Sequence, residues 1–203
     1  MNRMNAGYWN HRFETFDTPW DIGYIPAPLK EYFNQLSNKN ISILIPGCGN
    51  SYEADYLLKN GFTNITLIDI SSVLTKKLAE KLKQYTGKEL SIITGNFFEL
   101  SGKYDLIIEQ TFFCTLEPVL RISYIERMYH LLKEDGKIAG LLFNKTFASP
   151  GPPFGGNIEE YRDLFAALFH IKTMEPCYNS IAPRAGTECF FIAAKSFNRK
   201  LED

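Results

Sequence analysis

The chain has 203 residues, of which 45% are hydrophobic, enough to bury one sizeable core, and we expect a single domain over 1–203. Its net charge of −1 and lack of a basic run argue against nucleic acid as the main partner. No apolar stretch approaches the roughly 18 residues that cross a bilayer. These properties favour a small molecule as the partner. We also expect a monomer, although the sequence does not fix the oligomeric state.

The four cysteines lack the short spacing of metal sites, and the polar start of the chain lacks the pattern of a secretion leader. The three histidines are likewise scattered. We therefore expect a reduced, cytoplasmic protein with free thiols and no metal, and no cysteine nucleophile, because no histidine stands at a spacing that would activate one.

An N-terminal stretch rich in aromatic residues comes first, and seven apolar runs then predict strands. These runs are 41–46, 65–69, 90–94, 104–109, 137–143, 170–175 and 188–195. Helical spacing predicts helices at 51–60, 71–84, 118–133 and 157–169. We expect Asn50 or Ser51 to cap the first helix, and Asp69 and Ser71 precede the second as its candidate caps. We expect Pro118 to lie in the first turn of the third helix and Asp135-Gly136 to form a turn after it.

The alternation of strands and helices predicts an α/β, doubly wound, mostly parallel sheet, which binds ligands at the carboxyl ends of its strands. The last two runs are joined by a loop, 177–187, that has no helical period. Because strands without a crossover helix run antiparallel, they predict a terminal antiparallel hairpin.

A run of Ile43-Leu44-Ile45-Pro46 breaks into Gly47-Cys48-Gly49, which is typical of the turn that opens a nucleotide-type pocket. Asp69 ends the next apolar run, about twenty residues on, where such folds place a carboxylate on a ribose diol. A tight turn and a helix-capping aspartate would explain both features as well.

The choice of cofactor follows from a missing glycine. Tyr52 stands where a dinucleotide fingerprint needs its third glycine, and S-adenosylmethionine has no pyrophosphate that requires one. On this interpretation Gly47 and Gly49 admit the ligand and Asp69 binds the ribose. Asn96 and Phe97 then follow the third run at the expected adenine end, while we expect Phe98 to be core.

Several motifs occur in one order: Trp20-Asp21-x-Gly23, Pro-Gly-Cys-Gly, Asn96-Phe97-Phe98, Thr111-Phe112-Phe113-Cys114 and Gly151-Pro152-Pro153-Phe154. Together they resemble the thiopurine S-methyltransferase family, especially its thiol and halide methyltransferases. The resemblance implies a Rossmann-like class I methyltransferase with a seven-stranded sheet, in which 1–36 covers the cofactor and 37–198 form the core. It assigns to the cofactor site Trp9, Trp20, Pro46, Gly47, Cys48, Gly49, Asp69, Ile70, Asn96 and Phe97, and to the junction with the substrate Gln110 and Thr111.

Relatives commonly have Asp at Asn96 and Asp-Arg at Glu109-Gln110. Neutral Gln110 can donate hydrogen bonds but cannot stabilise an anion as a guanidinium would, which weakens the case for thiopurine-like substrates. We expect Arg184, in the loop before the last strand, to supply the cation that favours a thiolate. A solvated loop arginine is the alternative.

The candidate catalytic groups are therefore Arg184 and Gln110. The expected substrate pocket also includes His11, Phe113 and Phe154. The Gly-Pro-Pro-Phe turn forms either a wall of that pocket or merely the loop before the helix at 157.

The predicted function is transfer of a methyl group from S-adenosylmethionine to a small soft nucleophile such as a thiol, thiocyanate, bisulfide or halide. An NAD-dependent oxidoreductase is a second possibility, which the missing third glycine and the terminal hairpin disfavour. A third is a module that binds S-adenosylmethionine without turnover, which the neutral Gln110 would suit.

Overall fold

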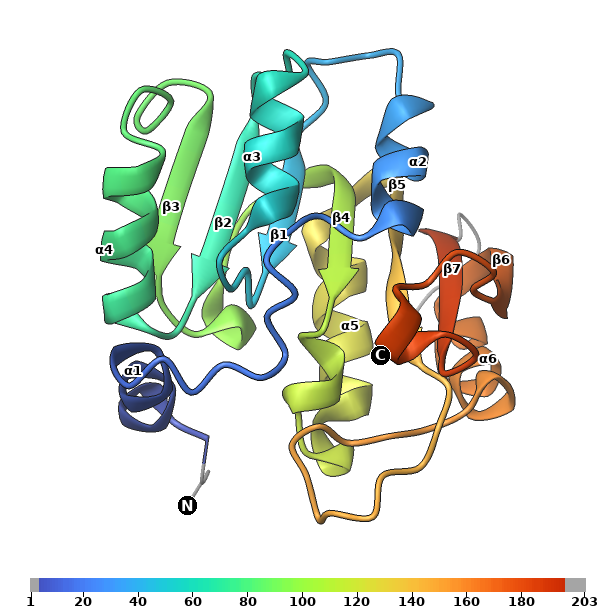
Figure 1. Cartoon of the computed structure of the whole chain (residues 1–203). Helices are drawn as coiled ribbons and strands as arrows, with labels where there is room; N and C mark the ends of the chain where they lie inside the picture. Colours follow the sequence, from blue (N-terminus) through green and yellow to red (C-terminus); the bar gives the residue numbers. More distant parts are fainter. Residues whose placement is uncertain (1–3, 196–203) are drawn as a thin grey trace. The chain divides into compact units, whose positions relative to one another are not determined.

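The computed structural model describes residues 4–195, which fall into two units that divide after Leu100 (Figure 1). We call residues 4–100 unit 1 and residues 101–195 unit 2. The ends of the predicted domain, 1–3 and 196–203, lie outside the described residues. The organisation of the chain as one domain stays a prediction.

Unit 1 contains three strands, which are parallel, as the sequence predicted, and which stand in the order β3-β2-β1. They are β1 (Ile43–Pro46), β2 (Ile65–Asp69) and β3 (Leu90–Thr94). The strands alternate with α3 (Tyr52–Lys59) and α4 (Ser72–Lys81), and the short 3-10 helix η1 (Phe97–Glu99) follows β3. Every residue of β1 is buried, which is characteristic of a parallel strand covered on both faces.

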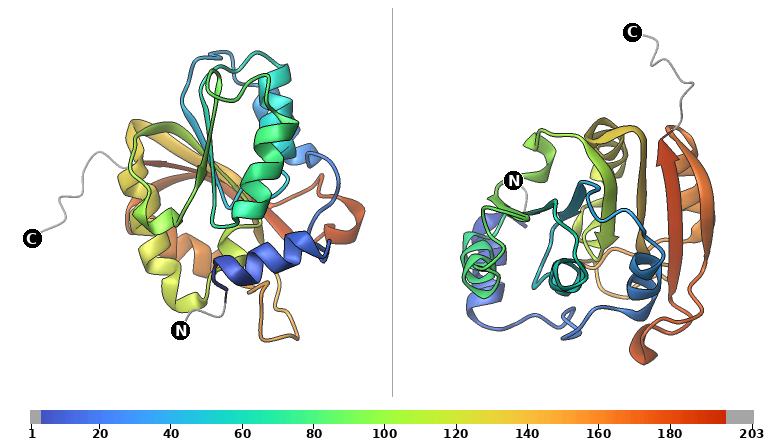
Figure 2. Two further views of the ribbon diagram at one scale, coloured as in Figure 1. Left: turned by 90° about the vertical axis from the view of Figure 1, so that its left-hand side faces the viewer. Right: turned by 90° about the horizontal axis from the view of Figure 1, so that it is seen from above.

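The N-terminal stretch forms two helices that the sequence analysis did not predict, α1 (Ala6–Glu14) and α2 (Ala27–Asn34). Asn5 caps α1 by accepting from the Tyr8 N–H at 3.1 Å. Asn10 of α1 accepts from the Ser71 hydroxyl at 2.8 Å and the Val73 N–H at 3.3 Å. These bonds place α1 beside the start of α4, as both views of Figure 2 show.

The helix starts of unit 1 confirm one predicted cap and correct the other. The Ser71 hydroxyl accepts from the Leu74 N–H, as expected. Ser51 stands at the N-cap of α3 but has a φ of +47° and makes no side-chain cap bond. The Asn50 amide donates to Asp21 instead, so neither predicted residue caps α3 with its side chain.

Unit 2 contains four strands in the order β4-β5-β7-β6. They are β4 (Tyr104–Gln110), β5 (Leu132–Phe143), β6 (Phe169–Pro176) and β7 (Glu188–Lys195). β4 and β5 are parallel, whereas β7 runs antiparallel to both β5 and β6. The predicted terminal hairpin is confirmed, and the right-hand view of Figure 2 shows β6 and β7 side by side.

The helices of unit 2 are α5 (Arg121–Leu131) and α6 (Ile158–Ala166), with the 3-10 helices η2 (Phe113–Thr115), η3 (Pro118–Leu120) and η4 (Ala182–Arg184). Pro118 therefore begins a 3-10 turn, and the third predicted helix starts later than expected.

The start of β5 also differs from the prediction. This strand begins at Leu132 rather than at residue 137, and the expected turn Asp135-Gly136 lies inside it. The pairing with β4 steps from Leu132 directly to Lys137, so the residues between them form an irregularity in the strand. A Cβ on Gly136 would lie 2.9 Å from the Tyr104 carbonyl oxygen. The glycine is thus needed for close approach of the two strands rather than for the expected turn.

Candidate functional site

The glycine turn begins where β1 ends, at Pro46. Gly47 and Gly49 have φ values of +54° and +49°, in the left-handed region that disfavours other residues. A Cβ added at Gly49 would meet no protein atom within 4 Å. The left-handed backbone, and not contact with other protein atoms, therefore requires glycine at position 49. The space beside it can admit a ligand.

Asp69, at the end of β2, joins that turn to the start of α4. Its Oδ1 accepts from the Ser71 N–H at 2.9 Å, and the N–H groups of Gly49 and Ile70 also hydrogen-bond the carboxylate. Burial raises the pKa of Asp69 to about 6, against the effect of these bonds. Ser71, not Asp69, caps α4. The capping alternative is therefore wrong for Asp69, which instead braces the glycine turn.

The Asp21 side chain of the Trp20-Asp21-x-Gly23 motif makes hydrogen bonds that the sequence did not reveal. Asp21 Oδ1 accepts from the Gly23 N–H at 2.8 Å, and Gly23 has a φ of +81°. Asp21 Oδ2 accepts from the Asn50 amide and from the Tyr52 hydroxyl. The aspartate thus ties the N-terminal segment to the residues that follow the glycine turn.

The two tryptophans expected to cover the cofactor lie together. The rings of Trp9 and Trp20 are 5.5 Å apart in an edge-to-face arrangement, and Phe13 packs on Trp20. Arg12 lies over the Trp20 ring at 4.7 Å and pairs with Asp17. In this arrangement the guanidinium already occupies a cation–π position on Trp20.

At the expected adenine end, the Asn96 side chain makes hydrogen bonds to neighbouring residues of its own turn. Asn96 Oδ1 accepts from the Phe98 N–H at 3.1 Å, and the Asn96 amide donates to Glu99 at 3.0 Å. Phe97 is buried, whereas Phe98 is half-buried, the reverse of the expectation that Phe98 belongs to the core. Ile70 is also half-buried.

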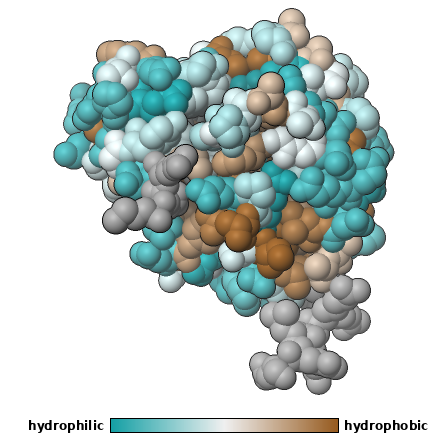
Figure 3. Space-filling model, turned by 90° about the horizontal axis from the view of Figure 1, so that it is seen from below, coloured by the Kyte–Doolittle hydropathy of each residue, from teal (hydrophilic) through white to brown (hydrophobic). Residues whose placement is uncertain are grey.

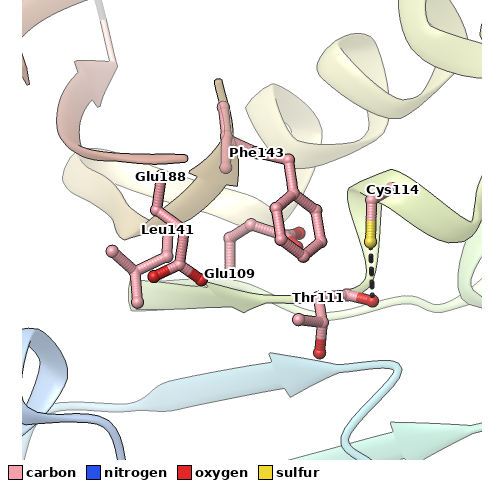
Figure 4. A pocket seen from close by; sticks show the side chains of 7 residues that line it. Glu109, Thr111, Cys114, Leu141, Phe143 and Glu188 are labelled. Carbon is pink, nitrogen blue, oxygen red and sulfur yellow. Dashed lines mark hydrogen bonds between the residues drawn. The ribbon is translucent and has the colours of Figure 1, made fainter. Parts of the chain in front are cut away.

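Unit 2 has a pocket at the carboxyl end of β4 (Figure 4). It is lined by Glu109, Thr111, Cys114, Leu141, Leu142, Phe143 and Glu188. Figure 4 shows Glu188 and Cys114 on opposite sides of the pocket, with the Cys114 thiol donating a hydrogen bond to the Thr111 carbonyl oxygen. Thr111 has a φ of +57°, and left-handed backbone in a β-branched residue is strained and tends to occur at functional sites.

Glu109 holds this strained turn and was not predicted as a functional residue. Its Oε1 accepts from the N–H groups of Phe112 and Phe113 at 2.8 and 2.9 Å, and its Oε2 accepts from the Tyr124 hydroxyl at 2.5 Å. Burial raises the pKa of Glu109 to about 7. The position of a carboxyl group near the end of a strand was the only sequence signal for a functional role of Glu109. Its hydrogen-bond partners could be identified only from the structure.

Arg184, the expected cation, lies in η4. Its guanidinium pairs with Glu188 at 3.3 Å and lies 5.4 Å from the centre of the Phe143 ring. The side chain is only 11% exposed, so the alternative of a solvated loop arginine is wrong. Glu188 and Phe143, which Arg184 contacts, both line the pocket. The charge of Arg184 also lowers the pKa of Cys114, but burial raises that pKa by more.

The other residues expected at the acceptor site, Gln110, Phe113 and His11, differ in burial and in their contacts. Gln110 Oε1 is buried and has no hydrogen-bond partner among residues 4–195. Phe113 is buried against Tyr124 and Tyr161, which makes its ring part of the core. His11, in unit 1, is exposed on α1.

The Gly-Pro-Pro-Phe turn is anchored to the segment that carries Thr111. The Phe154 N–H donates to the Cys114 carbonyl at 2.7 Å. Gly151 has a φ of +90°, and a Cβ there would lie 2.6 Å from the Phe154 ring. The peptide bonds before Pro152 and Pro153 are cis. The turn is therefore anchored within unit 2, and its role as a wall of the acceptor pocket stays a prediction.

All four cysteines are free and buried, which confirms the expected free thiols. Burial raises the pKa of Cys48 and of Cys114, so both are neutral thiols near pH 7 and poor nucleophiles.

The surface of each unit exposes single large apolar side chains, among them Phe16 and Tyr24 in unit 1 and Val119, Ile122 and Tyr178 in unit 2. Figure 3 shows apolar residues among polar ones on the face that it presents. Scattered exposure is common on proteins and does not define a binding face. Of the helices described, none combines the length and apolar character that a membrane span requires.

The thiopurine S-methyltransferase family matches residues 4–194, nearly the whole described chain. The chain belongs to this family. It is 30% identical over 193 residues to the Arabidopsis thaliana protein named "Probable thiol methyltransferase 2", covering 93% of this chain and 84% of the relative. It is also 30% identical to thiocyanate methyltransferase 1 of Brassica oleracea, covering 91% and 83%.

Solved structures agree on the fold. A Burkholderia thailandensis 1,6-didemethyltoxoflavin-N1-methyltransferase with bound S-adenosylhomocysteine matches with a TM-score of 0.73 and 18% identity, covering 94% of this chain and 87% of the other. The predicted class I methyltransferase fold, with a mostly parallel seven-stranded sheet and a C-terminal antiparallel hairpin, is thereby confirmed.

As a family member, this chain is an S-adenosylmethionine-dependent methyltransferase. The residues of unit 1 fit that cofactor, because the glycine turn has space beside it and a buried carboxylate stands where the second strand ends. Neither the oxidoreductase nor the module without turnover gains support from the comparisons.

Proposed function

We propose that the chain methylates a small sulfur nucleophile, such as a thiol, thiocyanate or bisulfide, with halide as a further acceptor. The observation that carries this proposal is the 30% identity, over more than 90% of the chain, to relatives named thiol and thiocyanate methyltransferases. The buried cation Arg184 supports it, because its contact residues Glu188 and Phe143 line the pocket.

We assign cofactor binding to unit 1. The cofactor supplies an electrophilic methyl group on a sulfonium when it is bound. Asp69 accepts hydrogen bonds from the ribose hydroxyls, and the glycine turn approaches the amino acid portion. Cys48 stays protonated, because burial raises its pKa, so the chain does not offer a competing thiolate beside the methyl donor.

We assign acceptor binding to unit 2. Arg184 stabilises the negative charge of the acceptor sulfur before transfer. Leu141, Leu142 and Phe143 exclude water, which keeps the small anion poorly solvated and reactive. Gln110 donates a hydrogen bond that orients the acceptor. Alignment and exclusion of water, rather than proton transfer by a side chain, are then the main contributions of the protein.

The proposal also includes a cytoplasmic monomer with no nucleic-acid partner. A net charge of −1 and four free buried cysteines are consistent with that setting.

The test is a panel of acceptors, with formation of S-adenosylhomocysteine measured as initial rates. The panel should contain thiocyanate, bisulfide, iodide, an aromatic thiol and a thiopurine. We expect the small sulfur anions to give the highest kcat/KM. A higher kcat/KM with the thiopurine, or turnover with none of the acceptors, would refute the proposed acceptor class.

A further inference from the structure

The charge of Arg184 is partly balanced inside the protein. Glu188 Oε1 lies 3.3 Å from the guanidinium, and the side chains of the pair are 11% and 4% exposed. Charge-assisted hydrogen bonds are usually shorter, about 2.7–2.9 Å. The pair is therefore buried but loosely joined.

The two partners are held by different elements. Glu188 is the first residue of β7 and pairs with Phe143 of β5, so its backbone is fixed by the sheet. Arg184 ends η4, where its N–H donates to the Ile181 carbonyl and its carbonyl accepts from the Thr187 N–H. The carboxylate is thus a fixed part of the pocket wall, and the guanidinium reaches it from a loop.

An anionic acceptor that binds Arg184 must compete with this fixed carboxylate. The pair as a whole is neutral, so the pocket attracts an anion less strongly than an unpaired guanidinium would. Glu188 also lines the same pocket as Phe143, over which Arg184 lies.

We propose that Glu188 is a specificity-determining residue, which acts as the internal counter-ion of Arg184 and sets the affinity of the pocket for anionic acceptors. This inference rests on the proposed function, because it takes Arg184 as the group that binds the acceptor anion. It does not require Glu188 to accept a proton.

The test compares Glu188→Gln with the wild type, using thiocyanate as the acceptor. Thiocyanate is a permanent anion, so a change in its KM reports charge competition and not proton transfer to Glu188. We expect the KM to fall roughly tenfold, the lower end of what a charge-assisted hydrogen bond contributes. An unchanged or higher KM would overturn the proposal.

Two controls make the result specific. Glu175→Gln removes the same charge from an exposed position on β6, and it should leave the KM unchanged. In an Arg184→Gln background, the added Glu188→Gln substitution should no longer lower the KM. A tenfold fall in either control would show that net charge, rather than the pair, is responsible, and would contradict the inference.

A binding measurement separates this inference from the proposed function. Isotope-labelled thiocyanate is titrated by NMR into the wild type and into Glu188→Gln, each with S-adenosylhomocysteine. Tighter binding by the variant supports the counter-ion role even if no acceptor turns over, and equal binding refutes it even if the enzyme is active. Should Glu188→Gln fail to fold, Glu188→Asp, whose shorter side chain weakens the pair, is expected to show the same change to a smaller extent.

Discussion

If Asp69 accepts hydrogen bonds from the ribose hydroxyls as a carboxylate, as we propose, cofactor affinity should weaken as the pH falls below about 6. Burial raises the pKa of this group to about 6 in the free protein. If the ionised form alone binds, the apparent dissociation constant rises about twofold at the pKa and about tenfold one pH unit below it. Calorimetric titration of S-adenosylhomocysteine across this pH range measures the effect.

The variant Asp69→Asn should bind about 10- to 100-fold more weakly above the pKa, since it loses charge-assisted hydrogen bonds. It should also lose the pH dependence. Glu53 is the matched control, because burial raises the pKa of this second acid of unit 1 to about 7. Glu53→Gln should keep the wild-type dependence near pH 6. Wild-type affinity and pH dependence in Asp69→Asn would refute the placement of the ribose on Asp69.

The same pKa predicts the opposite trend for stability. Because the folded-state pKa of Asp69 lies above its ordinary value of 3.8, its contribution to the free energy of unfolding is fully present below pH 3.8 and is lost as the pH rises through about 6. A shift of about two units corresponds to about 3 kcal/mol. In urea denaturation without cofactor, the wild type should therefore gain stability relative to Asp69→Asn as the pH falls. A constant difference would contradict the raised pKa.

Three further substitutions test other parts of the site. Gly49→Ala should cost about 1 kcal/mol of unfolding free energy through left-handed strain. If the space beside the turn holds the ligand, the same substitution should weaken S-adenosylhomocysteine binding more than tenfold in calorimetry. Unchanged affinity would show that the ligand does not occupy that space. Arg184→Gln should lower kcat/KM for thiocyanate while the dissociation constant of S-adenosylhomocysteine stays the same, and wild-type kinetics would remove Arg184 from the acceptor site. Tyr124→Phe leaves the buried Glu109 Oε2 without its hydroxyl donor and should cost about 1–3 kcal/mol in urea denaturation, whereas wild-type stability would show that the bond contributes little.

Apolar runs and their order made most of the fold predictable. All seven predicted strands form, although β5 starts five residues earlier than expected, and the loop without helical period did produce an antiparallel hairpin. The sequence also contains signals for the α2 helix, since Pro28 lies in its first turn and Leu29, Tyr32 and Phe33 follow at helical spacing. Recognising that pattern would have predicted this helix.

The site was less predictable, because its chemistry depends on contacts between residues distant in sequence. Asp21 reaches Asn50 and Tyr52 across about thirty positions, and nothing in the local pattern reveals that meeting. Glu188 lies four residues after Arg184, but at the junction of a loop and a strand this spacing alone does not predict an ion pair. The distribution of charge in the pocket therefore became visible only with the fold.

The most direct test of methyl transfer to sulfur uses S-adenosylmethionine with a deuterium-labelled methyl group and thiocyanate or bisulfide as acceptor. The account predicts a labelled methyl group on the acceptor sulfur, formed in a one-to-one ratio with S-adenosylhomocysteine. Binding of the cofactor with no labelled product from any sulfur acceptor, or label on nitrogen or oxygen instead, would contradict it.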